Sequence, residues 1–349
     1  MTEVTTSIAP ASLAETMLCG TCMAPGQFAL TRHPMPQTAP EGWVLVDIAA
    51  VGLCGTDYHI FQGKHPFLAY PRVIGHELSG HVALATAAWP QGTAVVINPY
   101  VSCGTCRACL RGKPNCCQRI AVLGVHRDGG MCARIAVPAA NLYPAEGLAP
   151  DAAAMVEFLA IGAHAVRRGQ VAQHDRVLVT GGGPIGLGAA LFAKARGAEV
   201  HLRDASPERL DQAATLGFTH LHHAAENLPA DLADGFDVVF DATGNAKAMQ
   251  AGFAHVAHGG TYVLVSVVTD DITFSDPEFH KREMQLVGAR NATAQDFETV
   301  MDAFRRQIIQ PAALLSERIS LADLPARLPE LAADRARLIK VIVDMGASA

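Results

Sequence analysis

The chain has 349 residues, of which 50% are hydrophobic and 17% are charged, and its formal net charge is −6. A chain of this length is too long for one ordinary hydrophobic core, so we expect two globular domains. The mildly acidic balance provides no basic surface for nucleic acid. No apolar run approaches the roughly 18 residues that suggest a membrane span. We therefore expect neither a nucleic-acid partner nor a membrane partner.

The cysteines indicate a reducing compartment. Several of the nine lie between residues 103 and 117, and in a cytosolic chain such crowding indicates metal binding rather than disulfides. Residues 1 to about 16 are predicted to be a loose tail, and they lack the layout of a signal peptide, so we expect a cytoplasmic protein. Cys19 and Cys22 have the spacing of a redox or zinc pair, but no second pair accompanies them. We interpret them as two cysteines of a strand or loop.

The first 150 residues are predicted to be mainly β-structure, because β-type runs recur without a long helical period. The runs are Trp43–Val51, Val73–Ile74, Val95–Ile97 and Ala133–Val137. A helical period begins around Ala152–Arg168, and strands and helices then alternate. The strands are Val177–Val179, Val200–Leu202, Val238–Phe240, Tyr262–Val265 and Leu286–Val287, and the helices are Leu187–Arg196 and Pro207–Leu216, with Ser206 as N-cap. This alternation predicts a parallel sheet covered on both faces. A helix, Asp296–Arg306, and a strand, Leu338–Val343, end the chain.

Residues 181–186 read Gly-Gly-Gly-Pro-Ile-Gly between a hydrophobic strand and a helix, which is the context of a dinucleotide-binding turn. Gly181 permits the tight turn, Gly183 lets the backbone approach a pyrophosphate, and Gly186 lets the helix pack closely. Asp204, at the end of the next strand, favours NAD because its carboxylate would bind the ribose and repel a 2′-phosphate. Arg203 and Arg209 leave NADP open, since a nearby arginine can accommodate that phosphate.

Two groups of residues have the chemistry of zinc ligands. Cys103, Cys106, Cys109 and Cys117 form a compact set of four thiolates, which would close a tetrahedron and hold a structural ion; Cys116 competes for the fourth position. The second group, Cys54 and His76, lies in the stretch from Cys54 to Glu77, which also contains several carboxylates. These ligand types suit a catalytic zinc, but the third ligand must come from elsewhere in the chain.

With these motifs, the sequence resembles the medium-chain zinc-dependent alcohol dehydrogenases over nearly its whole length after the tail. Residues 70–77, Tyr-Pro-Arg-Val-Ile-Gly-His-Glu, and residues 279–283, Phe-His-Lys-Arg-Glu, are similar to the branch acting on polyols, threonine and sugar acids, in particular L-gulonate and L-galactonate dehydrogenases. The resemblance implies a GroES-like, mostly β catalytic domain of residues 1–152, with a zinc lobe at about 100–120. A doubly wound Rossmann domain of residues 153–291 would follow. Residues 292–349 would return to the catalytic domain.

The resemblance also implies roles for residues around the catalytic zinc. Cys54 and His76 match its first two ligands, and Glu157 matches the place where the polyol branch supplies the third. Glu77 matches a carboxylate beside the zinc that can coordinate it transiently, so whether Glu77 or water completes the shell stays open. Asp57 matches a residue that receives the other ring N–H of His76 and so fixes its tautomer.

Further matches concern the proton path, the second zinc and the cofactor. Thr56 matches the hydroxyl that bonds the substrate alcohol, and His59 the end of a proton relay that runs through the cofactor ribose. The four cysteines match the structural-zinc ligands, so we expect two Zn²⁺ ions per chain. The expected NAD contacts are Gly181, Gly183, Pro184, Ile185, Gly186, Asp204, Arg209, Thr243, Val265 and Val267.

Some residues depart from the family pattern or stay ambiguous. Phe158 stands where the branch commonly has proline, and residues 92–95 and 265–267 also differ, which affects the shape of the pocket. Arg290 and Asn291 follow the last strand of the parallel sheet and are substrate candidates, because an arginine there could clamp a carboxylate; an inter-domain salt bridge is the alternative. We interpret His164 and Arg167 as packing or surface residues. The histidines at 220–223, 255 and 258 have no metal partners at suitable spacing and are expected at the surface.

The predicted protein is an oxidoreductase that transfers hydride from a secondary alcohol of a sugar acid or polyol to NAD. Threonine 3-dehydrogenase and sorbitol- or galactitol-type dehydrogenase are alternatives, and a non-catalytic NAD-binding sensor is an alternative of another class. The expected partner is a small polyol or sugar-acid substrate, and we expect a homodimer or homotetramer.

Overall fold

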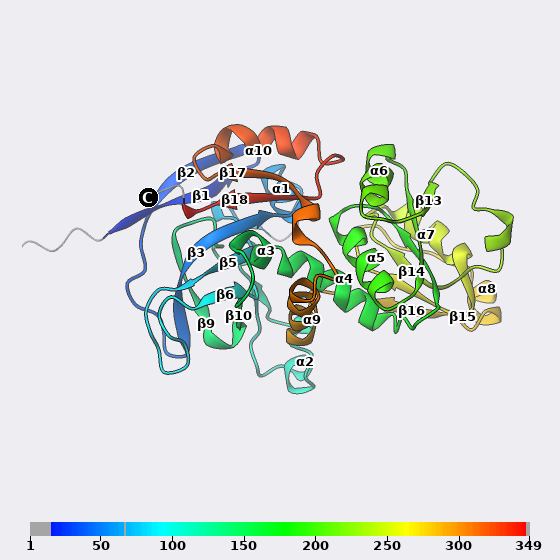
Figure 1. The fold of residues 1–349 in the computed structure, drawn as a ribbon, viewed down its shortest axis with the longest axis horizontal. Helices are drawn as coiled ribbons and strands as arrows, with labels where there is room; N and C mark the ends of the chain where they lie inside the picture. Colours follow the sequence, from blue (N-terminus) through cyan, green and yellow to red (C-terminus); the bar gives the residue numbers. More distant parts are fainter. Residues whose placement is uncertain (1–14, 66–67, 347–349) are drawn as a thin grey trace, which may run out of the picture.

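The computed structural model describes residues 15–65 and 68–346. They form two lobes, with α4 (Val156–Arg168) and α9 (Ala294–Arg305) between them (Figure 1). The predicted loose tail falls almost wholly outside the described residues; β1 begins at Thr16. No helix among the described residues has the length and apolar character needed to cross a bilayer.

The first lobe is built on a seven-stranded sheet. Its strand order is β10-β6-β5-β3-β18-β17, with β9 pairing with β3 as well. The strands are β3 (Trp43–Leu53), β5 (Glu77–Val82), β6 (Ala94–Ile97), β9 (Arg134–Pro138), β10 (Leu142–Pro144), β17 (Leu315–Ser320) and β18 (Lys340–Asp344). Two smaller sheets accompany it: β1 (Thr16–Ala24), β2 (Gln27–Pro34) and β4 (Arg72–Val73), and β7 (Tyr100–Val101) with β8 (Ala121–Val122). The end of the chain therefore lies in the same sheet as β3, because β18 pairs antiparallel with it.

The second lobe is a six-stranded parallel sheet with the strand order β13-β12-β11-β14-β15-β16. The strands are β11 (Arg176–Thr180), β12 (Glu199–Asp204), β13 (His220–His223), β14 (Phe236–Asp241), β15 (Val256–Leu264) and β16 (Gln285–Gly288). The connecting helices are α5 (Pro184–Ala195), α6 (Pro207–Thr215), α7 (Ala246–Gly252) and α8 (Asp276–Lys281). Because the order reverses direction between β11 and β14, the carboxyl ends of these strands form the ligand-binding edge of a doubly wound sheet.

The remaining helices are α1 (Gly55–Phe61), α2 (Arg107–Leu110), α3 (Pro150–Ala154) and α10 (Leu324–Ala333). The predicted fold class, a GroES-like β-domain with a Rossmann domain, is confirmed by the observed architecture. The single helix predicted around Ala152–Arg168 is instead two, α3 and α4, which meet at Met155. This break matters for function because it places Glu157 in the first turn of α4.

Several elements were not predicted. The missed strands are β1, β2, β5, β7, β8, β10 and β17, and the missed helices are α1, α2, α7, α8 and α10. Cys19 and Cys22 were interpreted as cysteines of a strand or loop, and both lie in strand β1. Strand β13 consists of the histidine-rich residues 220–223, which were expected only as surface residues. Histidine has no strong strand preference, so β13 forms through its pairing with β12 rather than through local propensity.

Candidate active site

The pairing of β3 with β5 brings Cys54 and His76 together. In this antiparallel pair Gly52 lies opposite Glu77, so the residue that follows β3 and the residue that precedes β5 emerge at the same end of the sheet. Gly52 is required there, because a Cβ at this position would lie 2.1 Å from Oε2 of Glu77. Cys54 is the N-cap of α1, and its backbone N–H donates to Oδ2 of Asp57 at 2.9 Å.

The potential ligand atoms of Cys54, His76 and Glu77 all lie within 4.8 Å of one another. Burial opposes the charged form of His76, but Asp57, Cys54 and Glu157 outweigh burial and raise the pKa of the ring well above its ordinary value. These neighbours favour a positive charge at this point, which a divalent cation would supply. Nδ1 of His76 lies 3.7 Å from Oδ1 of Asp57, so the expected hydrogen bond between them is not formed in this structure.

Glu157 borders this group from the start of α4 but is not a member of it. Its side chain is only 2% exposed, and burial raises the pKa of Glu157 to about 7. One carboxylate oxygen accepts a short hydrogen bond from the hydroxyl of Tyr100. The other, Oε2, is buried without a hydrogen-bond partner among the described residues. A buried, unpartnered carboxylate oxygen beside a cysteine and a histidine fits the third ligand of a zinc ion.

Glu77 forms a buried ion pair with a lysine. Nζ of Lys340, a residue 1% exposed on β18, contacts both carboxylate oxygens of Glu77 and donates to the carbonyl of Leu53 at 3.1 Å. The same ammonium group lies 4.3 Å from the centre of the Phe158 ring, within cation–π range. The phenylalanine that departs from the family pattern therefore covers this ion pair.

Helix α1 carries the residues of the expected proton relay. Thr56 and His59 lie three positions apart, so their side chains share one side of the helix. Nη1 of Arg335 lies 3.2 Å from Nε2 of His59. Burial, together with the charges of Arg335 and Lys64, lowers the pKa of His59. A neutral, partly exposed imidazole is suited to accepting a proton and passing it to solvent.

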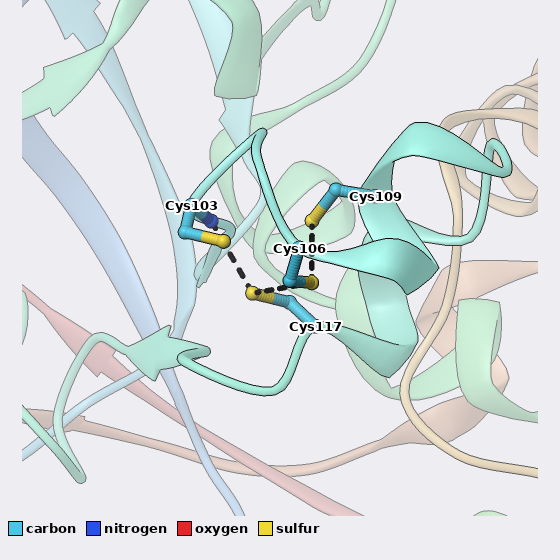
Figure 2. A group of neighbouring side chains, drawn as sticks. All are labelled: Cys103, Cys106, Cys109 and Cys117. Carbon is cyan, nitrogen blue, oxygen red and sulfur yellow. Dashed lines mark hydrogen bonds between the residues drawn. The ribbon is translucent and has the colours of Figure 1, made fainter.

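The four cysteines come together within the segment of residues 103–117. The sulfurs of Cys103, Cys106, Cys109 and Cys117 all lie within 4.8 Å of one another, and they face a common centre (Figure 2). Cys116 is exposed and lies outside the set. Hydrogen bonds from the backbone N–H groups of Thr105 and Cys106 help to lower the pKa of Cys103 to about 5. Four sulfurs arranged in this way fit a structural zinc ion.

The glycine turn connects β11 to α5. Gly181 has a φ of 98°, in the left-handed region that favours glycine. A Cβ at Gly186 would lie 1.7 Å from the carbonyl oxygen of Gly181, so only glycine fits there. Gly183 is the N-cap of α5, and Pro184 and Ile185 form its first turn. The free N–H groups of this turn can bind a phosphate.

Asp204 ends β12 beside this turn. Its Oδ2 accepts from the N–H of Gly182 at 2.6 Å, and its Oδ1 accepts from the N–H of Ser206 at 2.7 Å. Arg209 approaches from α6, because a Cβ at Gly183 would lie 2.4 Å from its Nη1. Arg203 is directed elsewhere: it donates to the carbonyl groups of Ala224 and Glu226. Of the two arginines considered from the sequence, only Arg209 adjoins the glycine turn.

The remaining cofactor candidates follow the neighbouring strands at the same edge of the sheet. Thr243 comes after β14 and donates from its N–H and its hydroxyl to the buried carboxylate of Asp241. Val265 comes directly after β15, and Val267, two residues on, is 90% exposed. All three therefore lie at the carboxyl ends of strands, where the nicotinamide half of a dinucleotide binds in doubly wound sheets.

The two substrate candidates after β16 differ in their contacts. Nδ2 of Asn291 donates to the carbonyl of Asn115 at 3.1 Å, so this amide connects the second lobe to the segment that carries the four cysteines. The side chain of Arg290 is exposed, and its backbone carbonyl accepts from Nδ2 of Asn115 at 2.9 Å. Its charge is one of those that lower the pKa of His126, after burial, which places the guanidinium near that histidine.

Sequence reasoning missed Tyr100, Lys340 and Arg335. Each contacts a candidate site residue, yet each lies more than forty positions from it in the chain. No local motif marks them, because their roles arise from tertiary pairing. The only available signal was the single lysine in the otherwise apolar run Leu338–Val343, since lysine is almost never fully buried unless it is paired.

Comparison with known proteins agrees with this geometry. Residues 40–147 match the alcohol dehydrogenase GroES-like domain, and residues 184–306 match the zinc-binding dehydrogenase family. The chain is 41% identical to L-galactonate-5-dehydrogenase of Escherichia coli K12 over 92% of this chain and 97% of that protein. This chain belongs to the zinc-type alcohol dehydrogenase family. The predicted family is thereby confirmed, and the chain is a dehydrogenase of that class.

Two solved structures share the fold. An alcohol dehydrogenase (rspB) from E. coli CFT073, complexed with NADH, superimposes with a TM-score of 0.88 at 28% identity, covering 95% of this chain and 99% of that chain. A zinc-binding dehydrogenase from Sinorhizobium meliloti 1021, bound to NADP, superimposes with a TM-score of 0.86 at 26% identity. The match covers 95% of this chain and 100% of that chain. Both nicotinamide cofactors thus occur among the similar structures.

Proposed function

We propose that this dehydrogenase oxidises the C5 hydroxyl of a hexonate, a six-carbon sugar acid, with NAD as acceptor. The observation that carries the proposal is the group beside α1 formed by the half-buried Cys54, the buried His76 and two buried carboxylates. Its donors suit a zinc ion, and similarity to the L-galactonate enzyme along nearly the full chain supports a sugar-acid substrate. Polyols and threonine are the alternative substrates.

We propose that Cys54, His76 and Glu157 hold the catalytic zinc and that the four cysteines hold a second, structural ion. The unpartnered Oε2 of Glu157 supports its role as the third ligand. Glu77 is the competing ligand, but Lys340 already neutralises its charge. Bound zinc would supply a Lewis acid that lowers the pKa of the substrate hydroxyl, and the nicotinamide would accept the hydride.

The residues of the chain orient the substrate and move its proton. The Thr56 hydroxyl accepts a hydrogen bond from the substrate hydroxyl and directs the proton toward His59, whose exposed edge releases it to solvent. Asp57 fixes the start of α1 by accepting the N–H groups of Cys54 and Gly75, which keeps Thr56 beside the metal ligands. Asp204, Thr243, Val265 and Val267 would position the cofactor. Arg290 remains a candidate for the substrate carboxylate, and the contacts of Asn291 support a structural role instead.

The substrate proposal is tested with the purified enzyme and NAD, by following the absorbance of the reduced cofactor. L-Galactonate and L-gulonate should give a kcat/KM well above those of sorbitol, galactitol and threonine. Faster oxidation of a polyol or of threonine would establish one of the alternative activities. A preparation that contains zinc and binds NAD, yet oxidises none of these compounds, would overturn the substrate proposal.

The ligand proposal is tested by Glu157→Gln beside Glu77→Gln. Glu157→Gln should lower turnover by at least about 100-fold and weaken the catalytic zinc, since it replaces a charged ligand with a neutral amide. Zinc content per chain, measured by elemental analysis after dialysis, separates a lost ligand from a misplaced substrate. Retention of zinc in Glu157→Gln with its loss in Glu77→Gln would assign the third position to Glu77.

Two coarser expectations also remain proposals. We propose a cytoplasmic location, supported by the four-cysteine set, whose members form no disulfide among the described residues. We also propose a homodimer or homotetramer. Light scattering of the purified enzyme would test the oligomeric state, and a mass of one chain would contradict it.

A further inference from the structure

A cluster of imidazoles lies on the outer part of the Rossmann sheet. In the parallel pairing of β12 with the edge strand β13, His201 lies opposite His220. Alternate residues of a strand face the same side of the sheet, so Glu199 and His201 share a face with His220 and His222. The structure thus corrects the expectation that the histidines near residue 220 have no metal partners.

The potential ligand atoms of this cluster lie close together. Oε1 of Glu199 lies 2.9 Å from Nε2 of His201. The rings of His201 and His220 stack with their centres 4.5 Å apart, so the exposed ring of His220 would turn out of this stack to aim a lone pair at a shared ion. The potential ligand atoms of Glu199, His201 and His220 all lie within 4.8 Å of one another. We propose that these three residues form a binding site for a divalent transition-metal ion, separate from the two zinc sites of the catalytic domain.

The surroundings of His201 resemble the supporting shell of a metal ligand. Its ring is 3% exposed, stacks on His220, lies nearly coplanar with the ring of His222, and packs against the edge of Phe236. Its Nδ1 lies 2.9 Å from Nε2 of His222. When Nδ1–H donates to His222, the lone pair on Nε2 points at the Glu199 carboxylate. Two acceptors 2.9 Å apart repel unless a cation lies between them, and a hydrogen-bonded second nitrogen is what orients most metal-binding histidines.

Access and charge define which ion would bind. Glu199 and His220 are exposed, so an ion can enter from solvent and complete its shell with water. Two imidazoles and one carboxylate favour Zn²⁺, Ni²⁺, Co²⁺ or Cu²⁺ over Mg²⁺ and Ca²⁺, which prefer oxygen ligands. The nearest competing cation is Arg176, whose Nε lies 3.5 Å from Oε1 of Glu199. Arg203, on the same face, is held by His255 and by backbone carbonyl groups.

The test uses the zinc-replete holoenzyme and Ni²⁺ as the probe. Equilibrium dialysis against micromolar Ni²⁺, followed by elemental analysis of both metals, should show one nickel ion bound per chain with the zinc content unchanged. His220→Ala and Glu199→Gln, which alter exposed residues, should each weaken nickel binding at least tenfold. His222→Ala should weaken it about 10- to 100-fold, as expected for a residue that orients a ligand. The control His258→Ala removes an exposed imidazole of β15 and should leave binding unchanged.

The competing arrangement needs no ion: His201 would donate to Glu199, and His222 would donate to His201. It predicts no saturable nickel binding by the holoenzyme below about 100 µM, or binding that His220→Ala and Glu199→Gln leave intact. Either result would overturn the proposal. Melting temperatures of the variants without nickel exclude misfolding as the cause of lost binding. Hexonate oxidation should be equal in all variants, so this test is independent of the proposed activity.

Discussion

At the scale of single residues, the candidate site depends on two residues that lie far from it in the sequence. Lys340 holds Glu77, and Tyr100 donates to Glu157. These two contacts leave the carboxylates inequivalent: one is neutralised by an ammonium group, and the other keeps a free oxygen. The difference gives a physical reason why one of two neighbouring acids would bind a metal while the other supports it.

Arg335→Ala should shift the acid limb of the pH–rate profile to higher pH. The folded-state pKa of His59 is lowered by burial and by the charge of Arg335, so removing that charge raises the pKa, and the ring stays protonated to a higher pH. A protonated His59 cannot accept the relayed proton. The measurement is kcat/KM against pH at saturating cofactor. Arg337→Ala, which removes a neighbouring arginine paired with Asp334, is the control, and equal profiles for both variants would exclude His59 from the relay.

Asp204→Asn should change the cofactor preference. The amide retains an acceptor for the N–H of Gly182 but loses the negative charge that would repel a 2′-phosphate, while Arg209 remains beside the turn. The ratio of kcat/KM for NADP to that for NAD should rise by about tenfold or more, since a charged hydrogen bond contributes roughly 1.5–3 kcal/mol. Asp211→Asn, on the exposed side of α6, should have no effect. An unchanged ratio in Asp204→Asn would show that this residue does not select the cofactor.

At the scale of elements, residues of a short motif come together through local geometry, whereas site residues that are distant in the sequence come together through strand pairing. The glycine turn and the four cysteines each lie within a short stretch, so local geometry brings their atoms together. Cys54 and His76 meet only because β3 and β5 pair in a register that places Gly52 opposite Glu77. A shift of one residue would turn these side chains to the other face of the sheet.

Cys117→Ser and Cys116→Ser should behave differently although the residues are adjacent. Cys117 lies in the four-sulfur set, whereas Cys116 is exposed. Cys117→Ser should lower the zinc content by one ion per chain and reduce Tm by about 5–10 °C, the shift expected for a loss of a few kcal/mol in a chain of this size. Cys116→Ser should change neither quantity. Elemental analysis and thermal unfolding test this, and the opposite pattern would identify Cys116 as the fourth ligand.

At the scale of the whole molecule, one polar network joins Asn115, near the four cysteines, to the end of the parallel sheet and to helices α4 and α9. Asn115 bonds the backbone of Arg290, and its amide lies 3.4 Å from Nε2 of His164. Nδ1 of His164 lies 2.9 Å from Oδ2 of Asp296 on α9, and Arg167 donates to the same carboxylate. His164 and Arg167 are thus packing residues that connect α4 with α9. The helix that carries Glu157 is fixed by this network.

Asp296→Asn should lower the free energy of unfolding by roughly 3 kcal/mol at pH 7, because it leaves buried donors without a charged acceptor. Burial opposes ionisation, but hydrogen bonds from His164, Arg167 and Thr293 outweigh it and lower the pKa of Asp296. The stability that this carboxylate contributes is therefore present above the unfolded pKa of about 4 and is lost as the pH falls below it. Denaturant unfolding at several pH values should show the parent and the variant converging below about pH 4.

The control for this measurement is Asp302→Asn, because Asp302 of α9 forms an exposed pair with Arg306, the C-cap of that helix. Its removal should cost less than about 1 kcal/mol at every pH. A constant difference between the parent and Asp296→Asn across the pH range would show that the stabilising contribution of Asp296 does not come from its charge.

The sequence by itself determined the alternation of strands and helices, the glycine turn and the cysteine set, because each depends on residue type and on short spacing. Residue type also selected Cys54 and His76, but only the pairing of β3 with β5 brings them together. Only the tertiary structure decided which residues surround them. Lys340 reaches Glu77 through the pairing of β18 with β3, and Tyr100 reaches Glu157 from a separate strand. Likewise, the pairing of β12 with β13 brings Glu199 and His201 to His220, which was expected at the surface without metal partners. The physical reason is that buried charges and metal ligands are satisfied by neighbours in space, and strand register, which no short motif encodes, selects those neighbours.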